Sequence, residues 1–285
     1  MQQRFQNNTH QYALALKKMP GDANDKAMQT LRNIGIIGRI TLIEGARRQV
    51  FHVLLFFALA LILGAVALAR FDGQVQRKML TDLGMCAIFL VSSLIAVTVS
   101  VGSLPGEVEQ RTITPVIAKP VLRWQFLFGK YAGAMATVAV GMAAMTGAFA
   151  GLEACYVGHV DVALFVVVPF LFLEAAVLGA IALWLSTFTS WPLAWFLSLL
   201  VCLLGNVRTP LYDHLTAQLQ SLFDKAAISA LYGLLPDLAS FDLKDALVHH
   251  LTLSGGLLAQ TAMYAVCYIW AVLGLAAYSF ARREL

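Results

Sequence analysis

Six apolar runs constrain the fold of this 285-residue chain more than any other feature of its sequence. A transmembrane helix needs about 20 predominantly apolar residues to cross the hydrocarbon core of a bilayer. Six segments meet or approach that length, at about Val50–Ala69, Gly84–Leu104, Lys130–Ala150, Val162–Leu185, Trp191–Val207 and Leu257–Phe280. The fifth is the shortest. The chain is therefore predicted to be an all-α integral membrane protein with six transmembrane helices.

The composition excludes several classes of protein. Apolar and aromatic residues make up 59% of the chain and charged residues only 13%. A soluble domain carries about 25% charged residues, so a soluble enzyme would lack the polar surface it needs. Disordered chains and nucleic-acid-binding proteins require low hydrophobicity or dense basic residues, and both are excluded. The four cysteines are widely spaced within or beside apolar runs, which favours no metal site and no disulfide framework.

The distribution of charge predicts the orientation in the membrane. Lys and Arg gather in cytosolic loops, and 14 of the 20 fall in the segments that are cytosolic if both termini are inside. Only 6 of the 16 acidic residues lie in those segments, and 9 lie in the outer ones. We therefore expect a multi-pass protein of the cell (inner) membrane with both termini in the cytosol.

Two polar segments flank the apolar runs. Residues 1–27 lack apolar periodicity and are predicted to form a flexible tail, whereas residues 28–49 interleave isoleucines with arginines. Such interleaving predicts an amphipathic helix on the membrane surface, and a cytosolic docking helix is compatible with the same pattern. Within residues 209–256, apolar residues recur at steps of three and four from Leu211 to Ala226, which predicts amphipathic outer helices between spans five and six. The whole of residues 50–285 is expected to form the six-span domain.

Glu174 is the one acidic residue near the centre of a predicted span. A charged side chain at that depth costs about 2.5–3.5 kcal/mol on insertion scales, so it needs a partner, a cavity or a proton. Glu174 is thus a possible intramembrane site, and a hydrogen-bonded structural role carries equal weight. Pro169 in the same span removes one backbone hydrogen bond and could open room beside the acid.

Small residues mark the third span as a packing element. Gly129 and Gly133 are four residues apart, as are Gly147 and Gly151. This spacing allows close approach of two helix backbones in a membrane. It predicts a central place in the bundle and carries no chemistry.

The cytosolic loop at residues 105–128 is the most informative stretch. Acidic residues open it, a short apolar set lies between prolines, and basic residues close it. A short helix of this kind suits docking into a groove of a cytosolic partner, although an ordinary interfacial loop remains an alternative. The candidate contact residues are Glu107, Glu109, Thr112, Ile113, Val116, Ile117, Lys119 and Arg123.

No motif for catalysis is visible. The sequence contains no metalloprotease, nucleophile-elbow or P-loop pattern, and Gly129-Lys130 lacks the preceding glycine that a P-loop requires. Leu253-Ser254-Gly255-Gly256 spells the core of an ATPase signature without its companion P-loop, and we expect it to form a turn before the sixth span. The chain is therefore expected to hold no metal or cofactor and to catalyse no reaction itself.

The loop resembles that of permease subunits of ABC type-2 exporters. The resemblance rests on Thr112-Ile113, Val116-Ile117, Ala118-Lys119-Pro120-Val121, Arg123, Phe126 and Gly129-Lys130, after Glu107 or Glu109. The lead-in Glu44-Gly45-Ala46-Arg47-Arg48 and the tail from Phe280 to Leu285 are also similar.

The resemblance implies a permease subunit that couples ATP hydrolysis by a separate cytosolic ABC ATPase subunit to export or extraction of a substrate. ATP and Mg²⁺ would bind in that ATPase, and the loop would be the coupling segment. A second permease copy or a related permease and membrane lipid would be the other partners. The alternative is a non-transporting membrane anchor or assembly subunit.

Overall fold

The computed structural model describes residues 23–47, 49–68, 73–103, 123–157, 164–208, 211–212, 214, 235–243 and 255–282. These residues are helical almost throughout, and no strand occurs among them. The helices are α2 (Ala23–Arg47), α3 (Gln49–Leu68), α4 (Gly73–Gly102), α7 (Arg123–Val157), α8 (Leu164–Ser186), α9 (Trp191–Asn206) and α13 (Gly255–Arg282), with a 3₁₀ turn, η1, at Ala239–Phe241.

Four of the described helices are long and apolar enough to cross a membrane. Their spanning parts are Thr81–Gly102, Trp124–Cys155, Leu164–Ser186 and Gly255–Phe280. Helices also cover the first and fifth predicted spans, but their apolar described parts, Phe51–Ala60 and Trp191–Asn206, are shorter. The described helices agree with the predicted all-α integral membrane protein, and four of the six predicted spans have a described helix of full length.

Two helices extend well beyond the apolar runs that predicted them. α4 starts well before Gly84, and α7 runs past both ends of its predicted span. An apolar run marks only the part of a helix that can lie in the hydrocarbon core of a bilayer. The helical hydrogen bonds of the backbone continue through polar residues outside that part. Because α7 begins at Arg123, residues 123–128 are helical, and the predicted loop 105–128 must end before them.

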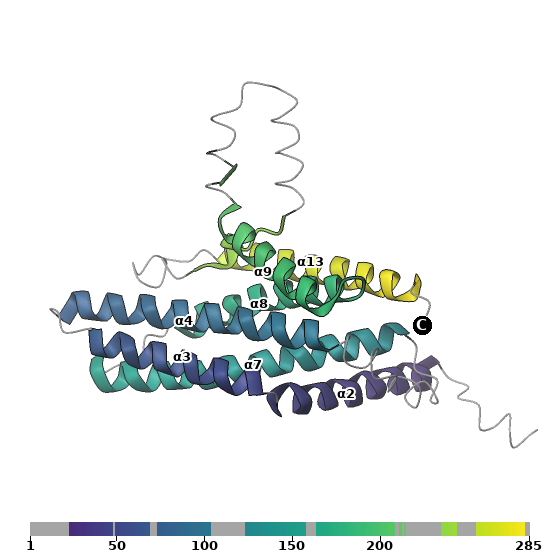
Figure 1. Ribbon diagram of the computed structural model, residues 1–285, viewed down its shortest axis with the longest axis horizontal. Helices are drawn as coiled ribbons and strands as arrows, with labels where there is room; N and C mark the ends of the chain where they lie inside the picture. The colour runs from purple at the N-terminus through teal and green to yellow at the C-terminus, as the bar shows by residue number, and fades with distance from the viewer. Residues whose placement is uncertain are drawn as a thin grey trace, which may run out of the picture.

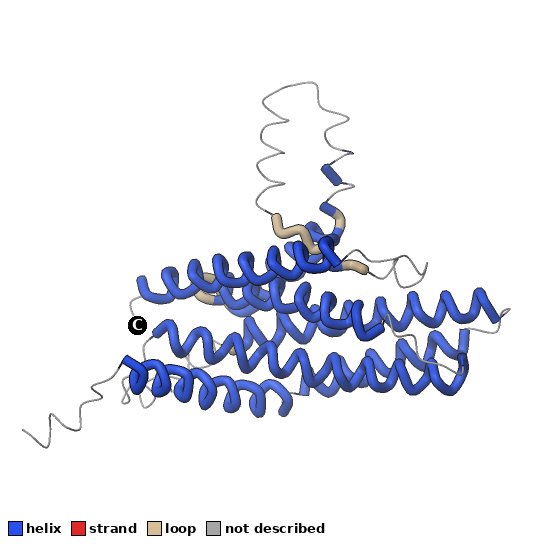
Figure 2. The backbone as a smooth tube through the Cα atoms, turned by 180° about the vertical axis from the view of Figure 1, so that it is seen from behind, coloured by secondary structure: helices blue, strands red, loops and turns tan. Residues whose placement is uncertain are grey.

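The helices form an elongated bundle with α8 at its centre. α4, α7, α9 and α13 all contact α8. α2 and α3 follow one another along one side, and α7 runs beside both, while α9 and α13 lie on the opposite side (Figures 1 and 2). The predicted central place of the third span, α7, agrees with its contacts to α2, α3, α4, α8 and α13.

Two apolar clusters hold the bundle together, and both include α8. The first joins the first half of α8 to α3, α4 and α7, with Phe149 and Met145 fully buried. The second joins Phe170 and the second half of α8 to α4, α7, α9, α13 and the buried residues Leu238 and Phe241. α8 is therefore apolar on all its faces, as expected for a helix surrounded by others.

Residues 235–243 form a short non-helical segment with one 3₁₀ turn, packed against the Gly205 end of α9. Arg208 donates a hydrogen bond from Nη1 to the carbonyl oxygen of Leu235 at 3.1 Å, and the backbone N–H of Asp237 donates to the Tyr264 hydroxyl at 3.0 Å. Most of the predicted outer helices in residues 209–256 lie outside the described residues.

Candidate functional site

The predicted coupling residues fall almost entirely outside the described residues. Glu107, Glu109, Thr112, Ile113, Val116, Ile117 and Lys119 all lie in the interval 104–122, and Arg123 is the first residue of α7. The structure does describe the helices that this interval joins. It connects the end of α4, after Ser103, to the beginning of α7.

α2 packs along the first half of α7 through backbone contacts between glycines. A Cβ atom built on Gly38 would lie 3.4 Å from the carbonyl oxygen of Gly129 and 3.6 Å from the nitrogen of Gly133. A Cβ on Gly133 would overlap the carbonyl oxygen of Gly38 and lie 2.5 Å from Cβ of Thr41. The predicted close approach at Gly129 and Gly133 is confirmed, and the partner is α2.

The second glycine pair of α7 makes no such contact. A Cβ atom built on Gly147 or Gly151 would meet no described atom within 4 Å. The same spacing therefore serves packing at one end of α7 and leaves an open face at the other.

Polar contacts accompany the glycine contacts. Lys130 of α7 is 2% exposed, and its Nζ lies 4.0 Å from Oε2 of the half-exposed Glu44 of α2. The same ammonium group lies 5.5 Å from the centre of the Phe126 ring. Gln125 donates a hydrogen bond from Nε2 to the Thr30 hydroxyl at 3.0 Å. A buried lysine requires such neighbours, because an isolated charge in a low-dielectric interior is unfavourable.

The prediction that α2 lies on the membrane surface is not confirmed. α2 runs lengthwise beside α7 and nearly in line with α3 (Figure 1). Its buried face carries Gly38, Thr41 and Gly45, and its exposed side carries apolar and basic residues. These exposed residues are Leu31, Arg32, Ile36, Arg39, Ile40, Ile43 and Arg47.

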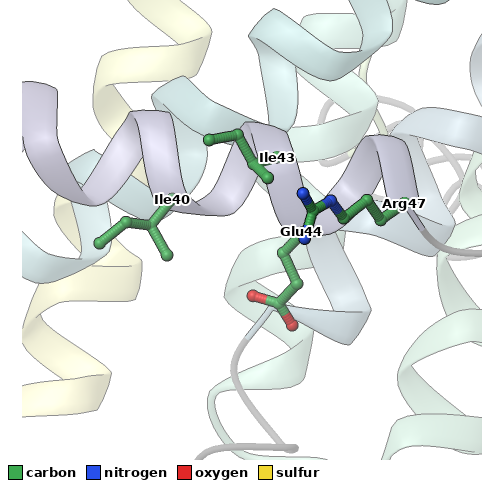
Figure 3. A pocket seen from close by; sticks show the side chains of 4 residues that line it. All are labelled: Ile40, Ile43, Glu44 and Arg47. Atoms are coloured by element: carbon green, nitrogen blue, oxygen red, sulfur yellow. The ribbon is translucent and has the colours of Figure 1, made fainter.

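A shallow hollow of about 460 Å³ lies on the outer side of α2. Its described lining consists of Ile40, Ile43, Glu44 and Arg47, which project from successive turns of the helix (Figure 3). The lining combines an apolar surface with one cation and one anion.

Glu174 lies near the middle of α8 and is 1% exposed. The side-chain amide of Asn206, at the end of α9, donates a hydrogen bond to Oε1 of Glu174 at 3.0 Å. The same amide nitrogen donates to the carbonyl oxygen of Cys202 at 3.0 Å. α8 is continuous through Pro169. Glu174 therefore links α8 to α9 in this conformation.

Among the described residues, no group of three or more His, Cys, Asp or Glu side chains is placed to hold a metal ion. The four cysteines are free thiols. What the arrangement offers is mechanical: a glycine-packed helix pair next to the predicted coupling loop, and a buried polar link between two spans.

Sequence reasoning missed three of these residues as contacts. Lys130 and Glu44 were named only within the two stretches that resemble ABC type-2 permeases, and no contact was predicted for either residue. Asn206 was not singled out. A signal for Asn206 was present, since an amide at the end of an otherwise apolar run in a membrane favours a hydrogen bond to another span. Nothing in the spacing could pair Glu44 with Lys130 across 86 positions of chain.

Comparison with known proteins extends this description to nearly the whole chain. A search of curated proteins found no match. The model of a protein family described as ABC-2 family transporter protein matches residues 7–285. That match includes both motifs that meet at Glu44 and Lys130, the loop between α4 and α7, and every described helix. The chain therefore belongs to the ABC-2 family of transporter proteins.

Proposed function

We propose that this chain is the permease subunit of an ATP-binding cassette exporter, in which a separate cytosolic ATPase subunit hydrolyses ATP with Mg²⁺. Hydrolysis is coupled to export of a substrate or its extraction from the membrane. Membership of the ABC-2 family over residues 7–285 carries the proposal. The four long apolar helices support a transmembrane role. The permease pairs with a second copy or a related permease.

The proposal includes six spans, with α3 and α9 as the first and fifth. α3 covers 20 residues and would reach about 30 Å, the thickness of a hydrocarbon core. Both termini lie in the cytosol of a cell whose inner membrane holds the protein. The exposed isoleucines and arginines of α2 then meet the lipid headgroups and water on the cytosolic side, and the amphipathic outer helices cover the opposite side.

The loop before Arg123 is the proposed contact with the ATPase. Replacing Ile113 and Ile117 together with Asp should lower ATP hydrolysis by the purified complex about tenfold, because charge in the apolar set opposes docking into a groove. The measurement is vanadate-sensitive phosphate release from the complex in nanodiscs. Membrane insertion and thermal stability of the permease should be unchanged.

The matched control replaces the same two residues with Val, which preserves their apolar character. Normal hydrolysis in the Asp variant would contradict the coupling role of the loop. Absence of any stimulated hydrolysis in the unmodified complex would instead favour the membrane-anchor function.

The proposed orientation predicts the result of a reporter fusion. A phosphatase that is active only outside the cytosol should be inactive when fused after Leu285, and a fluorescent protein that folds in the cytosol should be bright there. The physical reason is the excess of Lys and Arg in the segments assigned to the cytosol. A phosphatase fusion at Gly158, between α7 and α8, is the positive control, and activity at Leu285 would reverse the topology.

A further inference from the structure

Two short motifs that are far apart in the sequence meet where α2 ends beside α7. Glu44-Gly45 lies in the last turn of α2, and Gly129-Lys130 lies in the second turn of α7. The ion pair between Glu44 and Lys130 joins them directly. A Cβ on Gly45 would lie 2.9 Å from the Thr137 hydroxyl oxygen, so this turn of α2 also sits tightly against α7.

The contact is continuous along α2. Thr30 meets Gln125 near its beginning, Gly38 meets Gly129 and Gly133 in its middle, and Gly45 meets Thr137 near its end. The two helices therefore run parallel and in register over most of α2. Because backbone atoms touch in the middle of this contact, no side chain there can rotate to let the helices slide.

The helix pair is connected to the coupling loop at one end and to α3 at the other, so it can transmit movement between them. α7 begins at Arg123, where the coupling loop ends, and α3 begins at Gln49, two residues after α2 ends at Arg47. α2 and α3 are nearly in line (Figure 1). A displacement of the start of α7 would reach its own span directly and would also reach α3 through α2.

We propose that α2 and residues 123–137 of α7 move as one rigid unit, with Glu44 and Lys130 as positioning residues. This unit carries movement of the coupling loop into the first span as well as the third. This inference rests on the proposed function, because it assigns the loop to contact with an ATPase. Beyond the proposed function, it states that movement of the loop also reaches the first span, through α2.

A disulfide between the two helices tests the rigid unit. The Cβ atom of Ala132 lies 3.9 Å from a Cβ built on Gly38, which is within the range for a disulfide. The variant Gly38→Cys/Ala132→Cys, in a background with the four native cysteines replaced by alanine, should cross-link on oxidation in native membranes. Gly35→Cys/Ala132→Cys is the control and should not cross-link, because a Cβ on Gly35 meets nothing within 4 Å.

The cross-linked complex should hydrolyse ATP at a rate within about twofold of the rate after reduction, because the disulfide joins parts that move together. Loss of hydrolysis on oxidation and its return on reduction would overturn the inference, and so would failure of the pair to cross-link. If the reduced complex hydrolyses no ATP, the proposed function fails, while the cross-link still reports whether the helices are paired.

Charge exchange tests the positioning residues. Glu44→Lys should lower the maximal rate of ATP hydrolysis by the complex about fivefold and leave the KM for ATP unchanged, because nucleotide binds in the other subunit. Adding Lys130→Glu should restore most of the rate, and Lys130→Arg alone should retain it. A raised KM, or no recovery in the exchanged pair, would contradict the role of Glu44 and Lys130.

Discussion

Replacing Gly133 with leucine should destabilise the protein by about 3 kcal/mol or more, at the upper end of the range for overpacking. A Cβ at this position overlaps the carbonyl oxygen of Gly38 and crowds Thr41, and backbone atoms cannot rotate away. α2 must then separate from α7. Loss of monodisperse protein on heating in detergent measures the effect, with an expected shift of about 6–12 °C.

The matched control is Gly147→Leu, on the same helix. A Cβ there meets no described atom within 4 Å, and leucine favours helix more than glycine does. Its thermal midpoint should equal or exceed that of the unmodified protein. An equal loss of stability in both variants would show that the contact with α2 is not what distinguishes the two glycines.

Replacing Asn206 with leucine should lower stability by about 1–3 kcal/mol, because it removes a hydrogen-bond donor from a buried carboxyl group. The double variant Asn206→Leu with Glu174→Met should recover most of that loss. Replacing both partners with apolar groups of similar shape removes the need for a hydrogen bond. Thermal midpoints of the two single variants and the double variant give the coupling between the residues.

The double variant also decides the role of Glu174. If it is stable and its complex hydrolyses ATP and transports normally, Glu174 is a structural link between α8 and α9. If it is stable but inactive, the carboxyl group takes part in transport. Equal loss of stability in the double and single variants would contradict the contact itself.

Much of the fold follows from composition along the chain. The ends of α8 and α9 lie within about two residues of the runs Val162–Leu185 and Trp191–Val207, because those helices are apolar over nearly their full length. α4 and α7 extend further, because polar residues such as Gln74 and Gln125 continue a helix without resembling hydrocarbon. Apolar content predicts where a chain suits the membrane, and helix length depends on the backbone as well.

Pairings between helices were harder to predict. The spacing of Gly129 and Gly133 predicted that another helix packs closely against α7. Because a glycine allows any helix backbone to approach, the spacing could not identify α2 as that helix. The position of Glu174 within an apolar span similarly predicted a hydrogen-bond partner, but it could not identify Asn206 as that partner. The polarity of a residue states what kind of contact it requires, whereas the fold of the other helices decides which residue provides it.

The shortness of α9 has a consequence for the surrounding lipid. Its 16 residues reach about 24 Å, less than the roughly 30 Å of a typical hydrocarbon core. Residues 235–243 pack beside the Gly205 end of α9, and their Leu238 and Phe241 are fully buried. With α9 as a span, the bilayer at this edge must thin, or protein must fill the missing depth. The local thickness of the bilayer is then coupled to the packing of residues 235–243 against α9. Lipids with longer or shorter chains should therefore change the stability of that packing.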